Sequence, residues 1–231
     1  MREMKDFMKT YWSLFVLGIA YCLIGLAISA FLDIYMGTVM IWNLFLGILP
    51  YFFIRLSRLG SPRHNRFLGI AFALLWLLFF PNSVYLVTDL IHINSSDFYL
   101  SINYETTYYQ NILVWIEFIY IACGVLFGTL VGMISLDDVY RYLRKMHGRF
   151  SAWGSLGAIC LLTGLGIFIG RFLRLNSWDA LKPVDLMQAI MNAFNQFSIY
   201  YIVLIALYTL FVFALVHALR NSHLRKETDH D

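Results

Sequence analysis

Four polar side chains recur at helical spacing in the stretch Pro81 to His92, which reads PNSVYLVTDLIH. If the chain stays helical past Pro81, steps of three, four and three place them along one face: Asn82, Tyr85, Asp89 and His92. A His with a carboxylate three residues away can act as an oriented general base, or the pair can supply two metal ligands. A polar group in hydrocarbon costs on the order of several kcal/mol unless it is bonded, so we expect this face to contact protein or a wet cavity.

Three further ionisable residues lie within or at the ends of apolar segments and extend the candidate chemistry. Glu117 can be a third metal ligand, or it can pair with Arg171 or Arg174 and fix the register of two helices. Arg171 and Arg174 are three apart on one predicted helical face, a spacing suited to gripping a phosphate with two guanidinium groups. The alternative is that both arginines reach lipid phosphates or pair with acidic residues such as Asp179.

Neither a metal nor a cofactor is expected at these residues. His92 has no second histidine near it in the sequence, and no Ser or Cys nucleophile lies in a recognisable motif. Whether the protein is an enzyme is therefore left open, with Asp89, His92 and Glu117 as the catalytic candidates. Nucleic-acid binding has little support, because the basic loops are short and lack an aromatic recognition pattern.

The composition requires that these residues be positioned by membrane helices. The 231 residues are 60% hydrophobic and only 13% charged, which is far too apolar for a soluble domain of this size. We predict an all-α fold, a polytopic membrane helix bundle forming a single integral membrane domain over residues 1–231. The six expected transmembrane helices are Tyr11 to Leu32, Met36 to Ile54, Phe67 to Val87, Asn111 to Ile134, Trp153 to Leu173 and Ser198 to Leu219.

Local signals add detail to this bundle. Pro81 should kink or end its helix and free backbone carbonyls, to one of which Asn82 can donate. Pro183 is placed to open a short amphipathic helix at the outer membrane interface. The segment from Asn94 to Gln110 carries no clear structural signal, and the segment from Asp137 to Arg149 is predicted to be a basic loop.

Glycines four residues apart let two membrane helices approach closely. One such ladder comprises Gly124, Gly128 and Gly132. It can pack against another helix of the chain or mediate a homo- or hetero-oligomer.

The distribution of positive charge predicts the orientation in the membrane. Only three of the 17 Lys and Arg residues, Arg171, Arg174 and Lys182, fall on one side of the expected bundle. By the positive-inside rule the other side is cytoplasmic and carries both termini, as in a multi-pass protein of a bacterial cytoplasmic membrane. The polar residues then gather in the outer half of the membrane.

We predict that this outer layer binds an anionic lipid headgroup or lipid-linked ligand. The residues assigned to it are Asn43, Asn82, Asp89, His92, Glu117, Arg171, Arg174, Trp178 and Asp179. Three alternatives remain: an enzyme that acts on such a ligand, a small-solute transporter, and a structural partner of a membrane complex. A transporter is less well supported, since the expected third and fourth spans carry little ionisable chemistry deeper than Glu117.

Three segments together resemble a family of bacterial membrane proteins catalogued as domain of unknown function 1361. They are WNLFLGILPY from Trp42 to Tyr51, LFFPNSVYLVTDLIH from Leu78 to His92 and GRFLRLNSWD from Gly170 to Asp179. The resemblance implies a multi-helix protein of the bacterial cytoplasmic membrane, and it implies no reaction. The chain departs from the expected pattern at Ser83, where a small residue such as Ala is expected.

Overall fold

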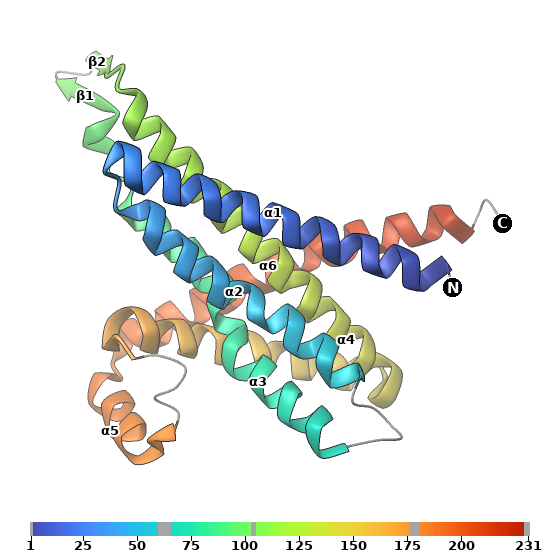
Figure 1. The fold of residues 1–231 in the computed structure, drawn as a ribbon. Coiled ribbons are helices and arrows are strands. Elements are labelled where there is room, and N and C mark those ends of the chain that lie inside the picture. Colours follow the sequence, from blue (N-terminus) through green and yellow to red (C-terminus); the bar gives the residue numbers. More distant parts are fainter. Residues whose placement is uncertain (1, 60–65, 103–104, 176–180, 229–231) are drawn as a thin grey trace. The chain divides into compact units, whose positions relative to one another are not determined.

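The computed structural model describes residues 2–59, 66–102, 105–175 and 181–228, and most of them are helical. Its elements are α1 (Arg2–Leu32), α2 (Met36–Leu59), α3 (Arg66–Tyr85), η1 (Leu86–His92), η2 (Ser95–Asp97), β1 (Tyr99–Ile102), β2 (Glu105–Tyr108), α4 (Ile112–Phe168), η3 (Ile169–Leu173), α5 (Pro183–Ala193) and α6 (Gln196–Thr228) (Figure 1). The 3-10 helices are η1 and η2, and η3 is a π-helix. The predicted all-α class is confirmed.

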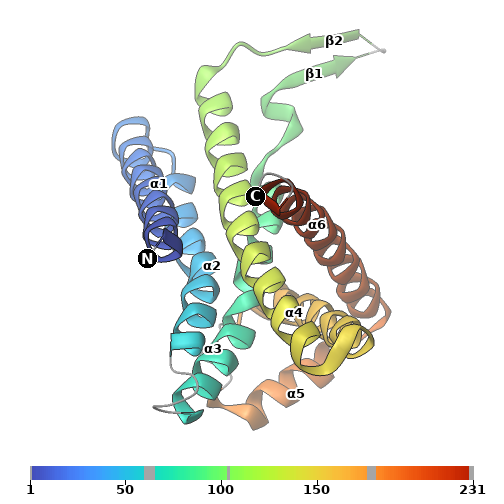
Figure 2. The same cartoon turned by 90° about the vertical axis from the view of Figure 1, so that its right-hand side faces the viewer.

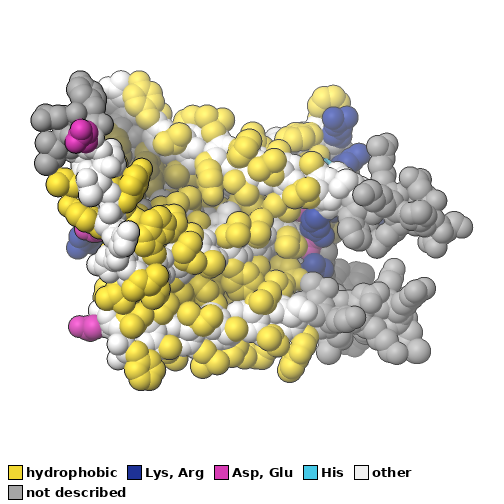
Figure 3. Space-filling model, turned by 90° about the horizontal axis from the view of Figure 1, so that it is seen from above, with side chains coloured by type: hydrophobic (Ala, Val, Ile, Leu, Met, Phe, Trp, Pro, Cys, Tyr) yellow, Lys and Arg dark blue, Asp and Glu magenta, His cyan; other side chains and the backbone are white. Residues whose placement is uncertain are grey.

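Among the described residues, five helical segments are long and apolar enough to cross a membrane: Trp12–Leu32, Met36–Ser57, Phe67–His92, Ile112–Leu173 and Gln196–Ser222. Hydrophobic side chains cover most of the face seen in Figure 3, as expected of helices that contact lipid. The fourth segment has 62 residues, whereas one crossing needs about 20. The predicted count of six transmembrane helices therefore stays a prediction.

The long helix α4 changes direction at Gly148. The φ angle there is 82°, a value that glycine adopts without the steric cost other residues meet. Figure 2 shows the chain turning back at this end of α4. The loop predicted from Asp137 to Arg149 is wrong, because the backbone stays helical up to this glycine. The physical reason at the start of this segment is burial: side chains from Val131 through Tyr140, including Asp137 and Asp138, pack almost continuously inside the protein.

The chain divides into two compact units, each built from two stretches that are separate in the sequence. The first unit comprises Met1–Phe45 and Thr88–Phe127, and the second comprises Leu46–Val87 and Gly128–Asp231. Each unit has its own packed interior. The single domain expected over residues 1–231 stays a prediction.

The first unit is held by tyrosines that bond to backbone groups of neighbouring helices. The rings of Tyr21 in α1 and Tyr120 in α4 stack with centroids 4.4 Å apart. The Tyr120 hydroxyl donates to the carbonyl of Gly37, 3.2 Å away, at the start of α2. A side chain at Gly124 would collide with the Tyr21 hydroxyl, so this glycine of the predicted ladder permits close packing inside the chain.

The second unit packs α3, α4 and α6 around buried aromatic side chains. Phe80 and Phe213 are fully buried in its core. Gly132 lies against Ser83, where a Cβ atom would collide with the serine side chain. Two glycines of the ladder thus pack against other helices of the same chain. Association of the protein through Gly124, Gly128 and Gly132 stays a prediction.

Two smaller elements complete the fold. Pro183 opens α5 as predicted, whereas the position of α5 at a membrane interface stays a prediction. The segment from Asn94 to Gln110 holds an antiparallel hairpin in which Tyr99 pairs with Tyr108, and Figure 2 shows it extending beyond the end of α4. Tyr, Thr and Ile favour extended backbone, which accounts for strands that the sequence analysis did not assign.

Candidate functional site

The first unit brings together two of the predicted site residues. Asn43 of α2 donates from Nδ2 to Oδ2 of Asp89 in η1, over 2.7 Å. The Asp89 residue is only 1% exposed, and Asn43 is half-buried. A short hydrogen bond between elements 46 residues apart fixes the carboxylate. Such a bond to a charged acceptor is stronger than one between neutral groups.

His92 is exposed at the end of η1. Neither a hydrogen bond nor an ion pair links it to any part of the chain that the structure describes. After Tyr85, α3 gives way to the 3-10 helix η1, which has about three residues per turn, so Asp89 and His92 lie on the same side of η1. No hydrogen bond joins Asp89 to His92 in the described residues, and the predicted polar face from Asn82 to His92 stays a prediction.

Glu117 is half-buried on α4 in the first unit. Within the described ranges it has no hydrogen-bond or ion-pair partner. Arg171 and Arg174 belong to the second unit, so the pairing of Glu117 with either arginine stays a prediction.

Asn82 and Ser83 form a packing junction in the second unit. The Asn82 side chain donates from Nδ2 to the carbonyl of Phe79 in the same helix, over 3.0 Å. This is the predicted bond from Asn82 to a backbone carbonyl near Pro81. Ser83 is fully buried, and its hydroxyl donates to the carbonyl of Gly47. The carbonyl of Ser83 accepts from the hydroxyl of Thr129 over 3.3 Å. The side chain of Ser83 thus bonds α3 to α2.

Arg171 packs on an aromatic ring where its helix loses regular geometry. Its guanidinium carbon lies 4.5 Å from the centroid of the Tyr85 ring, a cation–π contact. Gly170 sits beside the same ring, and a Cβ atom there would be in van der Waals contact with it at 3.6 Å. The arginine is therefore held by an aromatic surface.

Arg174 ends this helix in the left-handed conformation, with φ of 55°. Its backbone N–H bonds to the carbonyl of Ile169, and its side chain is exposed. The expectation that Arg171 and Arg174 share one helical face is wrong, because the π-helix ends at Leu173 and the backbone turns there. The predicted site residues Trp178 and Asp179 lie outside the described residues.

Disrupting the Asn43–Asp89 hydrogen bond should weaken the first unit. We expect Asn43→Ala to lower the free energy of unfolding by about 1.5–3 kcal/mol, because a buried carboxylate loses a bonded donor. Thermal unfolding in detergent, followed by circular dichroism, measures the loss. The matched control is Asn192→Ala, which removes an exposed amide from α5 and should leave stability unchanged. Equal stability of the two variants contradicts the role given to this bond.

A second cluster of ionisable side chains was missed in the sequence analysis. Asp137 and Asp138 of α4 are almost completely buried, and charged partners from α2, α4 and α6 surround them. The partners are Arg55, Arg141, His217 and Arg220. The spacing of Asp137 and Arg141, four apart, is typical of an ion pair on a helix and was the available signal.

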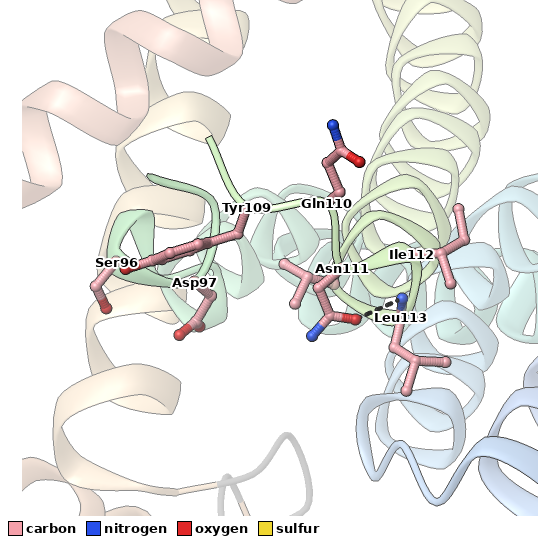
Figure 4. Close-up of a pocket in the computed structure, with 8 residues that line it drawn as sticks. Ser96, Asp97, Tyr109, Gln110, Asn111, Ile112 and Leu113 are labelled. Atoms are coloured by element: carbon pink, nitrogen blue, oxygen red, sulfur yellow. Dashed lines mark hydrogen bonds between the residues drawn. The ribbon is translucent and has the colours of Figure 1, made fainter. Parts of the chain in front are cut away.

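An open pocket of about 770 Å³ lies in the first unit, next to the β1–β2 hairpin. Its lining combines Ser96, Asp97, Tyr109, Gln110, Asn111, Ile112, Leu113 and Val114. Figure 4 shows Asn111 at the start of α4, where its Oδ1 accepts from the backbone N–H of Leu113 over 3.1 Å. None of the predicted site residues lines this pocket, and its lining carries a single charged side chain, Asp97.

No group of three or more His, Cys, Asp or Glu side chains within the described ranges could hold a metal ion. The chemistry of the predicted site therefore rests on the contacts described above, namely a buried Asp–Asn pair in one unit and an arginine stacked on tyrosine in the other.

Long apolar helices, exposed hydrophobic surfaces and bonded polar side chains within them define a multi-pass membrane protein. The chain belongs to the family described as "Protein of unknown function (DUF1361)", which matches residues 42–213. This match confirms the resemblance found in the sequence, whereas the bacterial origin stays a prediction. No curated protein matches the chain, and no solved structure does.

Proposed function

We propose that the protein binds an anionic headgroup, either of a lipid or of a lipid-linked ligand, and that Arg171 is the principal contact. The observation that supports this proposal is the stacking of the Arg171 guanidinium on Tyr85 at 4.5 Å. Stacking occupies the flat face of the guanidinium group. Its N–H donors lie in the plane, in a fork that matches two phosphate oxygens.

The local backbone suits a headgroup site. Gly170, next to Arg171 in the sequence, places only backbone beside the Tyr85 ring. A second positively charged side chain, Arg174, follows the π-helix three residues after Arg171 and is exposed. Irregular helix turns of this kind are often found at functional sites. The positive-inside rule predicts that this end of the helix lies on the outer side of the membrane.

Binding is better supported than catalysis. An enzyme that uses His92 as a general base would need a group that orients the imidazole, and none of the described residues bonds to it. Asn43 donates a hydrogen bond to the Asp89 carboxylate, and this bond fixes the position of that side chain. No described contact favours a transporter or an assembly partner over a headgroup-binding protein.

An anionic lipid should stabilise the protein through Arg171. We expect phosphatidylglycerol to raise the melting temperature of the detergent-purified protein more than phosphatidylcholine does, because ligands of the folded state stabilise it. In Arg171→Gln we expect most of this difference to disappear, with affinity falling about tenfold. Arg171→Lys should recover only part of it, since an ammonium group lacks the planar fork.

The control is Arg144→Gln, which removes one exposed positive charge from α4. This variant should keep the full difference between the two lipids. If it loses as much as Arg171→Gln does, the lipid effect reflects net charge, and the proposed site is wrong.

A further inference from the structure

Four side chains in the second unit form a closed hydrogen-bonded ring between α4 and α6. Arg141 donates from Nε to Oδ2 of Asp137 over 2.8 Å and from its terminal nitrogen to Oδ1 of Asn221 over 2.7 Å. Nδ2 of Asn221 lies 3.0 Å from Nε2 of His217. Nδ1 of His217 lies 2.5 Å from Oδ1 of Asp137, which closes the ring.

The chemistry of the four groups fixes the direction of every bond in this ring. Arginine can only donate, so Asn221 must present its oxygen to Arg141 and its NH₂ group to His217. Nε2 of His217 must then accept, and the ring proton must sit on Nδ1, facing the Asp137 carboxylate. All four bonds of the ring can form together only with an imidazole whose single proton is on Nδ1.

Other groups enclose the imidazole. Tyr140 of α4 meets it edge-on and Phe213 of α6 stacks on it, with centroids 5.1 Å and 5.4 Å away. Arg220 bonds both to Asp137 and to Asp138, over 2.7 Å and 3.1 Å.

Arg55 of α2 adds a third guanidinium group through its ion pair with Asp138. Among the described side chains, three guanidinium groups thus lie around the two carboxylates, and they repel a positive charge on His217.

We propose that the ring is a proton-sensitive latch between α4 and α6, closed while His217 is neutral and opened when Nε2 gains a proton. A protonated Nε2 points an N–H group at the NH₂ group of Asn221, so that bond is lost. Rotating the amide restores an acceptor for His217 but turns the NH₂ group toward Arg141, which also only donates. Either way, one proton removes one bond of the ring.

Two opposing effects act on the charged imidazole, and the bonding pattern decides between them. Asp137 attracts the positive charge, whereas Arg141 and Arg220 repel it. Because a proton on His217 would break one bond of the closed ring, we expect the stability contributed by the ring to be present at high pH and to decline as the pH falls through the range in which histidine ordinarily titrates, about pH 5 to 8.

The sign of the pH dependence is the test, and Asn221→Asp should reverse it. A carboxylate at position 221 accepts both from Arg141 and from a protonated His217, so the ring is complete only with the charged imidazole.

We expect the melting temperature of the wild type to fall by about 2–4 °C more between pH 8 and pH 5.5 than that of His217→Gln. Glutamine keeps one donor and one acceptor and cannot gain a proton. Asn221→Asp should gain stability over the same interval relative to His217→Gln.

Either of two results overturns the latch. If wild type and His217→Gln have the same pH dependence, His217 does not control the stability of the ring. If Asn221→Asp follows the wild type, the direction of the bonds is not what matters. Nitrogen-15 NMR of labelled histidine gives an independent answer, because the signal missing from His217→Gln must belong to a neutral ring protonated at Nδ1 at pH 8. A charged ring at that pH contradicts the inference even if one variant fails to fold.

Discussion

Replacing Asp137 with Asn is expected to lower the free energy of unfolding by about 3–5 kcal/mol, the largest loss for any single substitution considered. The side chain of Asp137 is 0% exposed. It accepts from Arg141 and Arg220 on Oδ2, and its Oδ1 faces Nδ1 of His217. An amide removes the negative charge that balances these guanidinium groups and replaces one acceptor with a donor.

Unfolding in detergent with increasing denaturant, followed by far-ultraviolet circular dichroism, measures this loss. Glu105→Gln is the matched control, because it neutralises an exposed carboxylate in β2. That change should stay within about 0.5 kcal/mol of the wild type. If Asp137→Asn and Glu105→Gln have the same free energy of unfolding, the buried charges contribute nothing to stability.

The second large effect is expected at Gly164, where α4 crosses α6. A Cβ atom there would collide with the carbonyl oxygen of Ile202 and lie 3.0 Å from its Cα atom. Backbone atoms cannot rotate away as a side chain can, so the helices must separate. We expect Gly164→Ala to cost about 1–3 kcal/mol, in the range of overpacked cores, measured by the same unfolding assay.

Gly157 provides the comparison within the same helix. A Cβ atom at Gly157 meets nothing within 4 Å. Gly157→Ala should therefore be neutral or stabilising by up to about 1 kcal/mol, because alanine favours helix. If both alanine variants behave alike, the close contact between Gly164 and Ile202 is not what holds the two helices together.

The membrane helices were predictable because burial in lipid demands long apolar runs that composition reveals directly. The start of α5 at Pro183 was predictable for a local reason, since proline lacks the N–H that a first turn leaves unused. Asn43 and Asp89, which the sequence analysis assigned to one polar layer, are hydrogen-bonded to each other, whereas the depth of that layer in the membrane stays a prediction.

The remaining features depend on tertiary contacts that no local pattern encodes. Asp137 and Asp138 were predicted to lie in a charged loop. Their partners in α2 and α6 are about 80 residues away along the chain in either direction, so no local pattern reveals the ion pairs. Arg171 and Arg174 were predicted to share one helical face, because the sequence spacing does not reveal the π-helix or the left-handed conformation of Arg174. Sequence periodicity assumes a regular helix, and it fails where packing changes the helix type.

Binding of an anionic ligand at Arg171 is tested most directly by native mass spectrometry of the detergent-purified protein with its lipids retained. The comparison is between the wild type and an Arg171→Ala, Arg174→Ala double variant of equal thermal stability. We expect a specific anionic lipid or lipid-linked sugar on the wild type that is missing from the double variant. Wild-type protein that carries only bulk lipid, or a double variant that retains the same anionic species, contradicts the proposed function.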